Sequence, residues 1–209
     1  MVLATSTSLA VARSPWAEVW SLDRTTPHQG STRPPTATPR PTPRAVEVTY
    51  RVDVRVPDPD GFAELLAATM ADPRGWSRAN FVVQEAPDAL YLVVLVEGDE
   101  AQRLCLPYDV SGEFSCQNGP AVVINAKRWR AGVTHWPLSL HEYRVMLLNH
   151  EMGHLLGQRH RPCTPGEPAP VMYQQSGSLR GCLANPWPLD DEIERAARHD
   201  LKLAPAFGE

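Results

Sequence analysis

Three residues within one short stretch have the types and spacing to hold and use a metal ion: His150, Glu151 and His154. Histidines four residues apart lie on the same side of an α-helix, so their imidazoles can occupy adjacent corners of a zinc tetrahedron. Glu151 points about 100° away from His150, too far round the helix for a third ligand to the same ion. Its carboxylate can instead take a proton from a metal-bound water, which is the HExxH arrangement of zinc hydrolases.

The string continues as HExxHxxGxxH through Gly157 and His160. A positive φ at Gly157 lets the chain turn sharply at the end of the helix and brings His160 back to the metal. Three histidines with the fourth position open are typical of a catalytic rather than a structural zinc site. We therefore predict a Zn²⁺ ion held by His150, His154 and His160, with Glu151 as the catalytic base.

A second His-Glu pair in the same segment offers an internal comparison. His141-Glu142 begins like the motif but has Val145 where the second histidine would stand, so we assign it no metal role. The competing interpretation of the main string is a set of buried histidines that satisfy their ring nitrogens by hydrogen bonds and hold no metal.

The helix that carries these residues is marked at both ends. Ser139 and Glu142 have the spacing of a capping box, which predicts a helix from Leu140. Gly157 is the favoured residue for a left-handed C-cap and predicts the end of the helix near Leu156. Apolar side chains occur on nearly all of its sides, so we expect the helix to be buried.

Apolar runs elsewhere predict the rest of the domain. They indicate strands over residues 46–56, 81–83, 91–96 and 121–124 and a short helix over 62–70. Asp190-Asp191-Glu192 opens a last helix, on which His199 is interpreted as a surface residue. This order of elements indicates an α+β fold in two layers. Four tryptophans are candidates for core packing or for lining a cleft: Trp76, Trp129, Trp136 and Trp187.

Residues 1–45 differ in composition from the rest. Residues 25–44 contain six prolines and six threonines with no acidic residue, which predicts an extended, disordered tail or a stalk. Residues 1–44 carry five arginines and two acidic residues, a net charge of +3 within a chain whose net charge is −4. The start of the chain lacks the basic segment of a clear signal peptide. The folded catalytic domain is expected over residues 46–209.

The four cysteines fall into two groups. Neighbour pairing joins Cys105 to Cys116 and Cys163 to Cys182, and it is one of three possible pairings. The second bridge would close a loop that contains Met172. A second zinc site made of thiolates is the alternative, but no CxxC spacing supports it. Disulfides imply an oxidising compartment, so we expect a secreted or cell-surface protein.

HExxHxxGxxH is the signature of the metzincin zinc peptidases, and this sequence resembles them. Metzincins also have a Met-turn beneath the metal, which Ala169-Pro170-Val171-Met172-Tyr173 resembles; Tyr173 directly after Met172 is similar to the matrixin pattern. Astacins and serralysins have a tyrosine that can ligate zinc two residues after the methionine, where Gln174 stands here. The resemblance implies a zincin-like α+β fold with a twisted mixed sheet, an active-site helix and a small C-terminal subdomain.

Further strings resemble an uncharacterised family of predicted secreted zinc peptidases from actinobacteria. This resemblance covers roughly residues 46–200 and includes Asp72-Pro73-Arg74-Gly75-Trp76, Asn149-His150-Glu151, Gln174-Gln175 and Asn185-Pro186-Trp187-Pro188.

The expected function is therefore that of a zinc metalloendopeptidase. An edge strand above the cleft, Ala121–Asn125, would pair with an extended peptide substrate. A sequence pI near 6.0 argues against a generally basic nucleic-acid binder. The sequence contains no run of about 18 apolar residues, so it predicts no membrane-spanning helix. We expect a monomer. The alternatives are a catalytically silent zinc module that binds peptides or surface polymers, and a hydrolase of non-peptide amides.

Overall fold

The computed structural model describes residues 45–57 and 59–198. The predicted tail lies outside these residues except for Ala45, and His199 lies outside them as well. The tail and the surface position of His199 therefore stay predictions.

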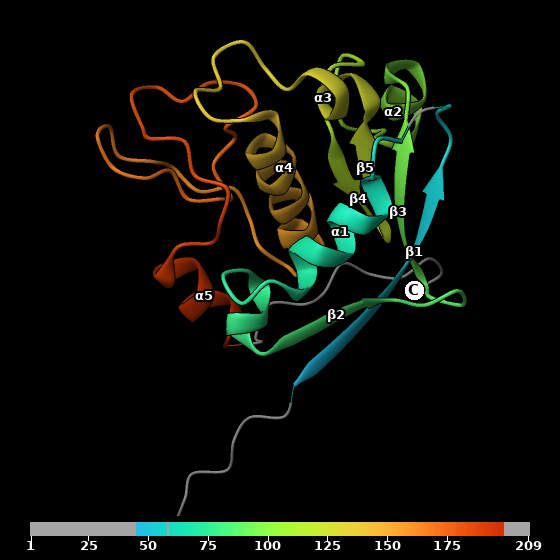
Figure 1. The fold of residues 1–209 in the computed structure, drawn as a ribbon, viewed down its shortest axis with the longest axis horizontal. Coiled ribbons are helices and arrows are strands. Elements are labelled where there is room, and N and C mark those ends of the chain that lie inside the picture. Colours follow the sequence, from blue (N-terminus) through green and yellow to red (C-terminus); the bar gives the residue numbers. More distant parts are fainter. Residues whose placement is uncertain (1–44, 58, 199–209) are drawn as a thin grey trace, which may run out of the picture. The chain divides into compact units, whose positions relative to one another are not determined.

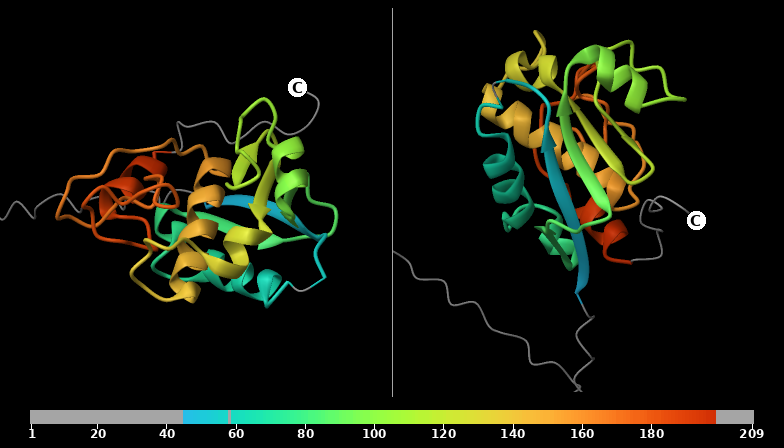
Figure 2. Two further views of the ribbon diagram at one scale, coloured as in Figure 1. Left: turned by 90° about the horizontal axis from the view of Figure 1, so that it is seen from above. Right: turned by 90° about the vertical axis from the view of Figure 1, so that its right-hand side faces the viewer.

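A five-stranded mixed β-sheet forms the centre of the described domain (Figure 1). The strand order is β2-β1-β3-β5-β4, in which only β4 runs antiparallel to its neighbour. The strands twist relative to one another, as Figure 2 shows. Their bounds are β1 Val46–Val54, β2 Phe81–Glu85, β3 Tyr91–Val96, β4 Cys116–Asn118 and β5 Ala121–Asn125. The expected combination of helices with a twisted mixed sheet is thus confirmed.

Strands β3 and β5 are apolar on both faces, which explains their nearly unbroken apolar sequences. Val93 and Leu95 of β3 belong to the larger core cluster, whereas Val94 and Val96 belong to a second cluster on the opposite face. Alternate side chains of a strand point to opposite faces of the sheet. A strand covered on both sides therefore reads as a continuous hydrophobic run.

The larger core lies between the sheet and helices on one face. These helices are α1 Phe62–Ala71, α3 Ala126–Ala131 and α4 Leu140–Leu155. Trp76 in the 3₁₀ helix η1 (Trp76–Ala79) and Trp129 in α3 are buried in this core, which fits the packing role among the two that their sequence allowed. The last described helix, α5 Asp190–Ala196, begins at the predicted acidic run.

The second face of the sheet is covered as well, which differs from the two layers expected. Helix α2 (Gly98–Leu104) packs there through Ala101, and Cys105 and Val110 complete the cluster. Helix α2 is too short and too polar to show a helical pattern of apolar residues in the sequence. Its stability comes from packing against the sheet rather than from helix propensity.

The cysteines are paired as their spacing predicts. Cys105 is bonded to Cys116 and Cys163 to Cys182, with Cα–Cα distances of 6.1 Å and 6.3 Å. The first bridge joins the end of α2 to β4. The second closes the loop that follows α4 and contains Met172.

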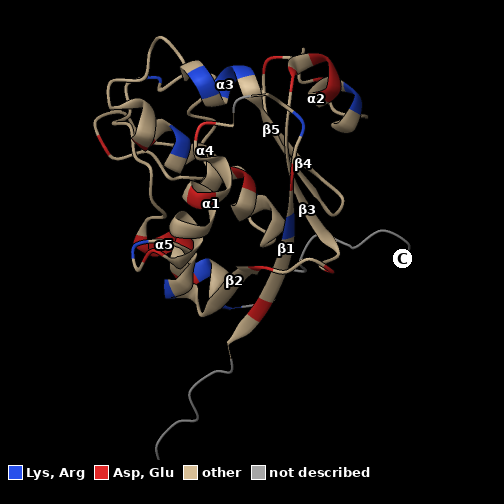
Figure 3. Ribbon diagram, turned by 45° about the vertical axis from the view of Figure 1, so that its right-hand side comes forward, with Lys and Arg blue, Asp and Glu red and all other residues tan. Residues whose placement is uncertain are grey.

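Basic residues gather on α3, as Figure 3 shows. Lys127 and Arg128 share an ion pair with Glu113, and Arg130 pairs with Glu97, so two carboxylates offset part of the positive charge of this group. Among the described residues, no helix has both the length and the apolar character needed to span a bilayer.

Candidate metal centre

Helix α4 has the ends that its sequence predicts. The Ser139 hydroxyl accepts the N–H of Glu142 at 3.2 Å, and the Glu142 carboxylate accepts the N–H of Ser139 at 2.9 Å, which forms a capping box. At the other end, Gly157 has a φ of 82°. The N–H of Gln158 donates to the carbonyl of Gly153 at 2.9 Å, as in a Schellman motif. This turn redirects the chain toward His160.

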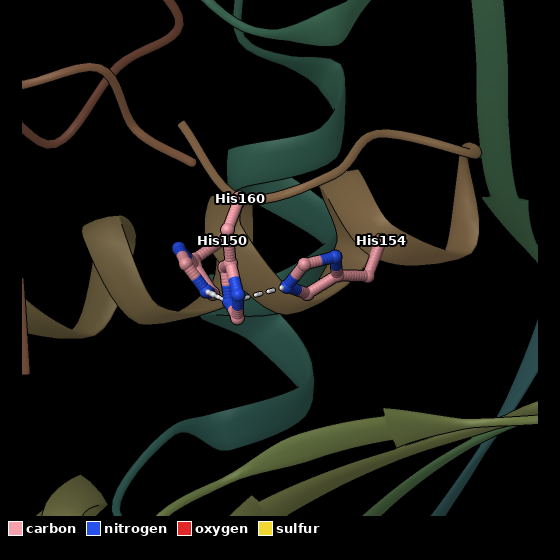
Figure 4. Close-up of side chains that lie close together, drawn as sticks. All are labelled: His150, His154 and His160. Atoms are coloured by element: carbon pink, nitrogen blue, oxygen red, sulfur yellow. Dashed lines mark hydrogen bonds between the residues drawn. The ribbon is translucent and has the colours of Figure 1, made fainter. Parts of the chain in front are cut away.

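Three imidazoles converge where the sequence predicts a metal site (Figure 4). His150 and His154 extend from α4, and His160 reaches back from the loop beyond Gly157. The Nε2 atom of His160 lies 3.3 Å from that of His150 and 3.1 Å from that of His154. Two ligands of a tetrahedral Zn²⁺ with metal–nitrogen distances of 2.0–2.1 Å are separated by about 3.3 Å. The spacing of the three histidines therefore suits a single zinc ion.

Hydrogen bonds on the far side of the rings fix which nitrogen faces the centre. Nδ1 of His150 lies 2.8 Å from the carbonyl oxygen of Val171, and Nδ1 of His154 lies 2.8 Å from that of Gln158. A carbonyl only accepts, so each Nδ1 carries the proton and each Nε2 presents a lone pair. His160 can place at most one proton between these nitrogens. A cation can bind the lone pairs of all three Nε2 atoms. Without a metal, a proton on Nε2 of His160 could be donated to His150 or to His154, and the other contact would join two nitrogens with no proton between them.

The environment keeps these rings neutral. Burial lowers the pKa of His150 to about 3 and that of His154 to about 4, and it also lowers the pKa of His160. Neutral imidazole is the form that binds metals. The site is therefore ready to accept a divalent cation at neutral pH without losing protons from these residues.

Glu151 lies beside the histidine cluster and outside it. The three histidines form the candidate ligand group without its carboxylate, as expected from its position on the helix. Glu151 lines the cleft over the cluster, and its side chain is nearly buried. Burial raises the pKa of Glu151 to about 8. A buried carboxyl that faces a cleft has the environment of a proton-transfer group.

Met172 packs against helix α4 at Gly153, which lies between His150 and His154 in the sequence. It is buried, and a Cβ atom added to Gly153 would collide with its sulfur. The same Cβ would lie 2.8 Å from the ring of Trp76. Trp76 in turn donates its indole N–H to the carbonyl of Asn149 at 3.0 Å. Glycine at position 153 thus permits the close approach of α4 to the predicted Met-turn.

A buried carboxylate that the sequence motifs do not reveal supports this turn. Glu192 accepts the N–H groups of Val171, Met172 and Leu189, each at 2.9 Å. The Val171 carbonyl is the group that orients the ring of His150. Glu192 therefore connects α5 to a predicted metal ligand through one peptide unit. Its sequence context indicates only the acidic first turn of a helix.

A cleft of about 810 Å³ opens over the histidines. Helix α4 contributes Met146, Leu147, His150, Glu151 and His154 to its lining. Further lining residues come from two loop regions, 108–117 beside β4 and 173–180 after Met172, which include Tyr173 and Gln174. None of the four tryptophans considered from the sequence lines it.

The strand at the cleft differs from the one predicted. Ala121–Asn125 is β5, which lies between β3 and β4 and is fully buried. The edge strand on this side of the sheet is β4, whose Cys116 and Gln117 line the cleft, and β2 forms the opposite edge. The prediction of β5 as the edge is therefore wrong. The reason is that a three-residue partner, too short to be evident in the sequence, covers it.

Comparison with protein families identifies a match over residues 34–194, to the family described as "Protein of unknown function (DUF3152)". The chain belongs to this family. No curated protein matches it. Among solved structures, the chain is similar to archaemetzincin from Methanopyrus kandleri, with 13% sequence identity and a TM-score of 0.45. That match covers 74% of this chain and 95% of the archaemetzincin chain.

Proposed function

We propose that the protein is a zinc-dependent metalloendopeptidase. The observation that carries the proposal is the convergence of three histidine Nε2 atoms in the lining of a cleft to which the buried Glu151 also contributes. The HExxHxxGxxH spacing accounts for each of these four side chains. Three histidines leave one position of a tetrahedral zinc open, as in catalytic zinc sites.

The proposed ligands are His150, His154 and His160. Zinc bound there would polarise the scissile carbonyl and lower the pKa of water. The chain's own contribution is to fix the rings: the Val171 and Gln158 carbonyls hold the protonated Nδ1 atoms and direct the lone pairs to one point. Such outer hydrogen bonds orient metal ligands and increase their basicity.

Glu151 is the proposed general base and acid. Its carboxylate accepts a proton from the attacking water and returns it to the leaving amine. In the metal-free protein, burial raises the pKa of Glu151 to about 8, which makes its carboxylate a stronger base than that of an exposed glutamate. The charge of a bound Zn²⁺ would lower this pKa and so favour the carboxylate that accepts the proton. A proton carrier is most effective when its pKa lies near the working pH.

Strand β4 is the proposed binding edge for an extended peptide. It is one of the two edge strands of the sheet, and it borders the cleft through Cys116 and Gln117. An edge strand offers unpaired backbone groups to which a peptide can add as a further strand. Recognition through the backbone suits an endopeptidase that binds substrate in extended form.

Export from the cytoplasm is part of the proposal. The two disulfides, Cys105–Cys116 and Cys163–Cys182, support an oxidising compartment. Residues 46–209 would form the catalytic domain, and residues 1–45 would serve as a spacer at the cell surface or in a secreted form. Thiol labelling of the protein isolated from its native compartment tests this, because free cysteines would contradict export.

Cleavage of a mixed peptide library by the zinc-loaded protein tests the activity. Glu151→Gln should reduce turnover by at least about 10²–10⁴-fold, the contribution typical of general acid–base catalysis. Its zinc content should match the wild type, because Glu151 lies outside the ligand group. Equal cleavage by both proteins would indicate a contaminating protease. No cleavage by the zinc-loaded wild type would favour a silent peptide-binding module.

A further inference from the structure

The cleft contains one basic side chain whose role the proposed chemistry does not explain. Among the described residues that line it, Arg180 is the one Arg or Lys. It is exposed, and its guanidinium has no acidic partner within the described part of the chain. Arg128 and Arg144 elsewhere in the domain, by contrast, form ion pairs with Glu113 and Asp60. Arg180 therefore offers a free cation to whatever enters the cleft.

The backbone at Arg180 has a positive φ, a conformation that arginine rarely adopts. The Cys182 N–H donates to the Leu179 carbonyl at 2.8 Å, so residues 179–182 form a tight turn. Its central residues, Arg180 and Gly181, have φ values of 45° and 85°. Turns with two positive φ values prefer Asn, Asp or Gly at the first central position, because longer side chains are strained there. Strained residues of this kind concentrate at functional sites.

The turn is also held in place on both sides. Cys182, directly after it, is bonded to Cys163. The Gly181 carbonyl accepts the N–H of Gly166 at 2.8 Å, and the Ser178 hydroxyl accepts the N–H of Arg180 at 3.2 Å. The Cα of Arg180 is therefore fixed relative to the cleft, and only its flexible side chain needs to be ordered when a ligand binds.

We propose that Arg180 recognises a carboxylate of the substrate and so gives the cleft a preference for acidic peptides. The carboxylate comes from an Asp or Glu side chain or from the free C-terminus of the peptide. A guanidinium pairs with either through two parallel hydrogen bonds. This inference rests on the proposed peptidase activity and names a substrate class for it. Recognition of the substrate by Arg180 would then explain why this turn holds an arginine at a position that favours Asn, Asp or Gly.

Matched peptides separate the two sources of the carboxylate. One series carries Glu or Gln at a single position, moved along an otherwise constant sequence. A second series carries a free or an amidated C-terminus. The quantity measured is the ratio of kcat/KM for each charged peptide to that for its neutral counterpart. For the wild type we expect a ratio of about ten at one position or at the terminus, the size of a single charge-assisted contact partly screened by water.

Arg180→Asn is the informative variant, because asparagine removes the charge and tolerates positive φ. We expect its melting temperature to equal or exceed that of the wild type, while the charged-to-neutral ratio falls to near one. Arg180→Lys should restore part of the preference. The matched control is Arg103→Gln, which removes the same charge from an exposed residue of α2 outside the cleft and should keep the wild-type ratio.

Each result decides the inference. A wild-type ratio near one in both series, or a preference that persists in Arg180→Asn, overturns the role of Arg180 and leaves the peptidase proposal intact. Loss of the preference in Arg103→Gln overturns it too, because long-range charge would then suffice.

If no peptide is cleaved, the peptidase proposal fails, and fluorescence anisotropy of the same peptides then tests the role of Arg180 through binding alone. Tighter binding of charged peptides that is lost in Arg180→Asn supports the inference, and equal binding contradicts it.

Discussion

The carboxylate of Glu192 accepts the backbone N–H of Met172 at 2.9 Å, which joins the last described helix to the turn beneath the histidine cluster. The same carboxylate accepts the N–H of Val171 at 2.9 Å. The carbonyl of Val171 accepts the Nδ1–H of His150. A residue 42 positions from His150 in the sequence therefore influences the orientation of its ring.

Glu192→Gln is expected to weaken zinc binding by roughly tenfold, at the lower end of the 10–100-fold effects typical of groups behind the ligands. An amide replaces one acceptor oxygen by an NH₂ group, which would face a backbone N–H. Chelator competition measures the affinity. Glu194→Gln, an exposed change on the same helix, is the matched control. Equal affinities of the two variants would show that Glu192 does not position His150.

His160→Ala is expected to lower zinc affinity by more than about 100-fold, because it removes a ligand rather than a group behind one. The stability of the metal-free protein should change little, since His160 keeps much of its surface open to solvent, although its ring is desolvated enough to lower its pKa. Metal analysis after dialysis against a chelator measures the loss. His141→Ala, in the other His-Glu pair, should keep the full zinc content. Full zinc content in His160→Ala would remove this residue from the site.

Gly153→Ala is expected to destabilise the fold by about 1–3 kcal/mol, the usual cost of adding a methyl group to a filled core. The new Cβ would meet Met172 and the ring of Trp76. Urea unfolding measures the effect. At Gly177, an added Cβ would lie 3.5 Å from the nearest atom, the carbonyl oxygen of Gln174. Gly177→Ala should therefore change stability by less than about 0.5 kcal/mol, and an equal effect at both sites would contradict the close packing at Gly153.

The metal-free protein is expected to be most stable near neutral pH. Burial lowers the folded-state pKa of His150 to about 3 and of His154 to about 4, while unfolded histidine titrates near about 6.5. The unfolded chain binds more protons at both positions, so stability falls as pH drops from about 6.5 toward 4. Burial raises the pKa of Glu151 to about 8. The folded chain binds the extra proton there, so stability also falls as pH rises from about 4.5 through 8.

Thermal melts in excess chelator from about pH 4 to about pH 9 measure both effects. Glu151→Gln should remove the loss at high pH that comes from Glu151 and keep the loss at low pH, because an amide does not titrate. A wild-type melting temperature that stays constant across this range would contradict the burial of all three groups in their neutral forms.

The helix that carries the histidines could be predicted closely because its signals are local. Ser139 and Glu142 form the expected capping box, and Gly157 has the expected positive φ. His150 and His154 lie four residues apart on this helix, and the turn at Gly157 brings His160 back to them. The spacing of these residues in the sequence was therefore sufficient to predict that the three histidines converge. Strand β3 could be predicted for a related reason, since burial on both faces leaves an unbroken apolar run.

Contacts between distant segments could not be predicted in the same way. Strand β4 has three residues, two of which are Gln117 and Asn118, and it exists because it pairs with β5. Polar amides have weak strand propensity, so nothing local indicates a strand there. The three bonds of Glu192 reach backbone groups that only the folded chain brings together. In the sequence, an acidic residue in the first turn of a helix accounts for Glu192 fully, so nothing there indicates these three hydrogen bonds.

The two disulfides enclose most of the cleft lining outside α4, in residues 106–115 and 164–181, while the three histidines lie outside both loops. Substitutions in a loop anchored at both ends can change its surface without displacing its ends. Within the second loop, the buried Val171 and Met172 support His150, whereas exposed residues that line the cleft, such as Gln174 and Ser178, have room to vary. Over evolutionary time, the exposed surface of these two segments can therefore change while the histidine cluster outside them stays the same.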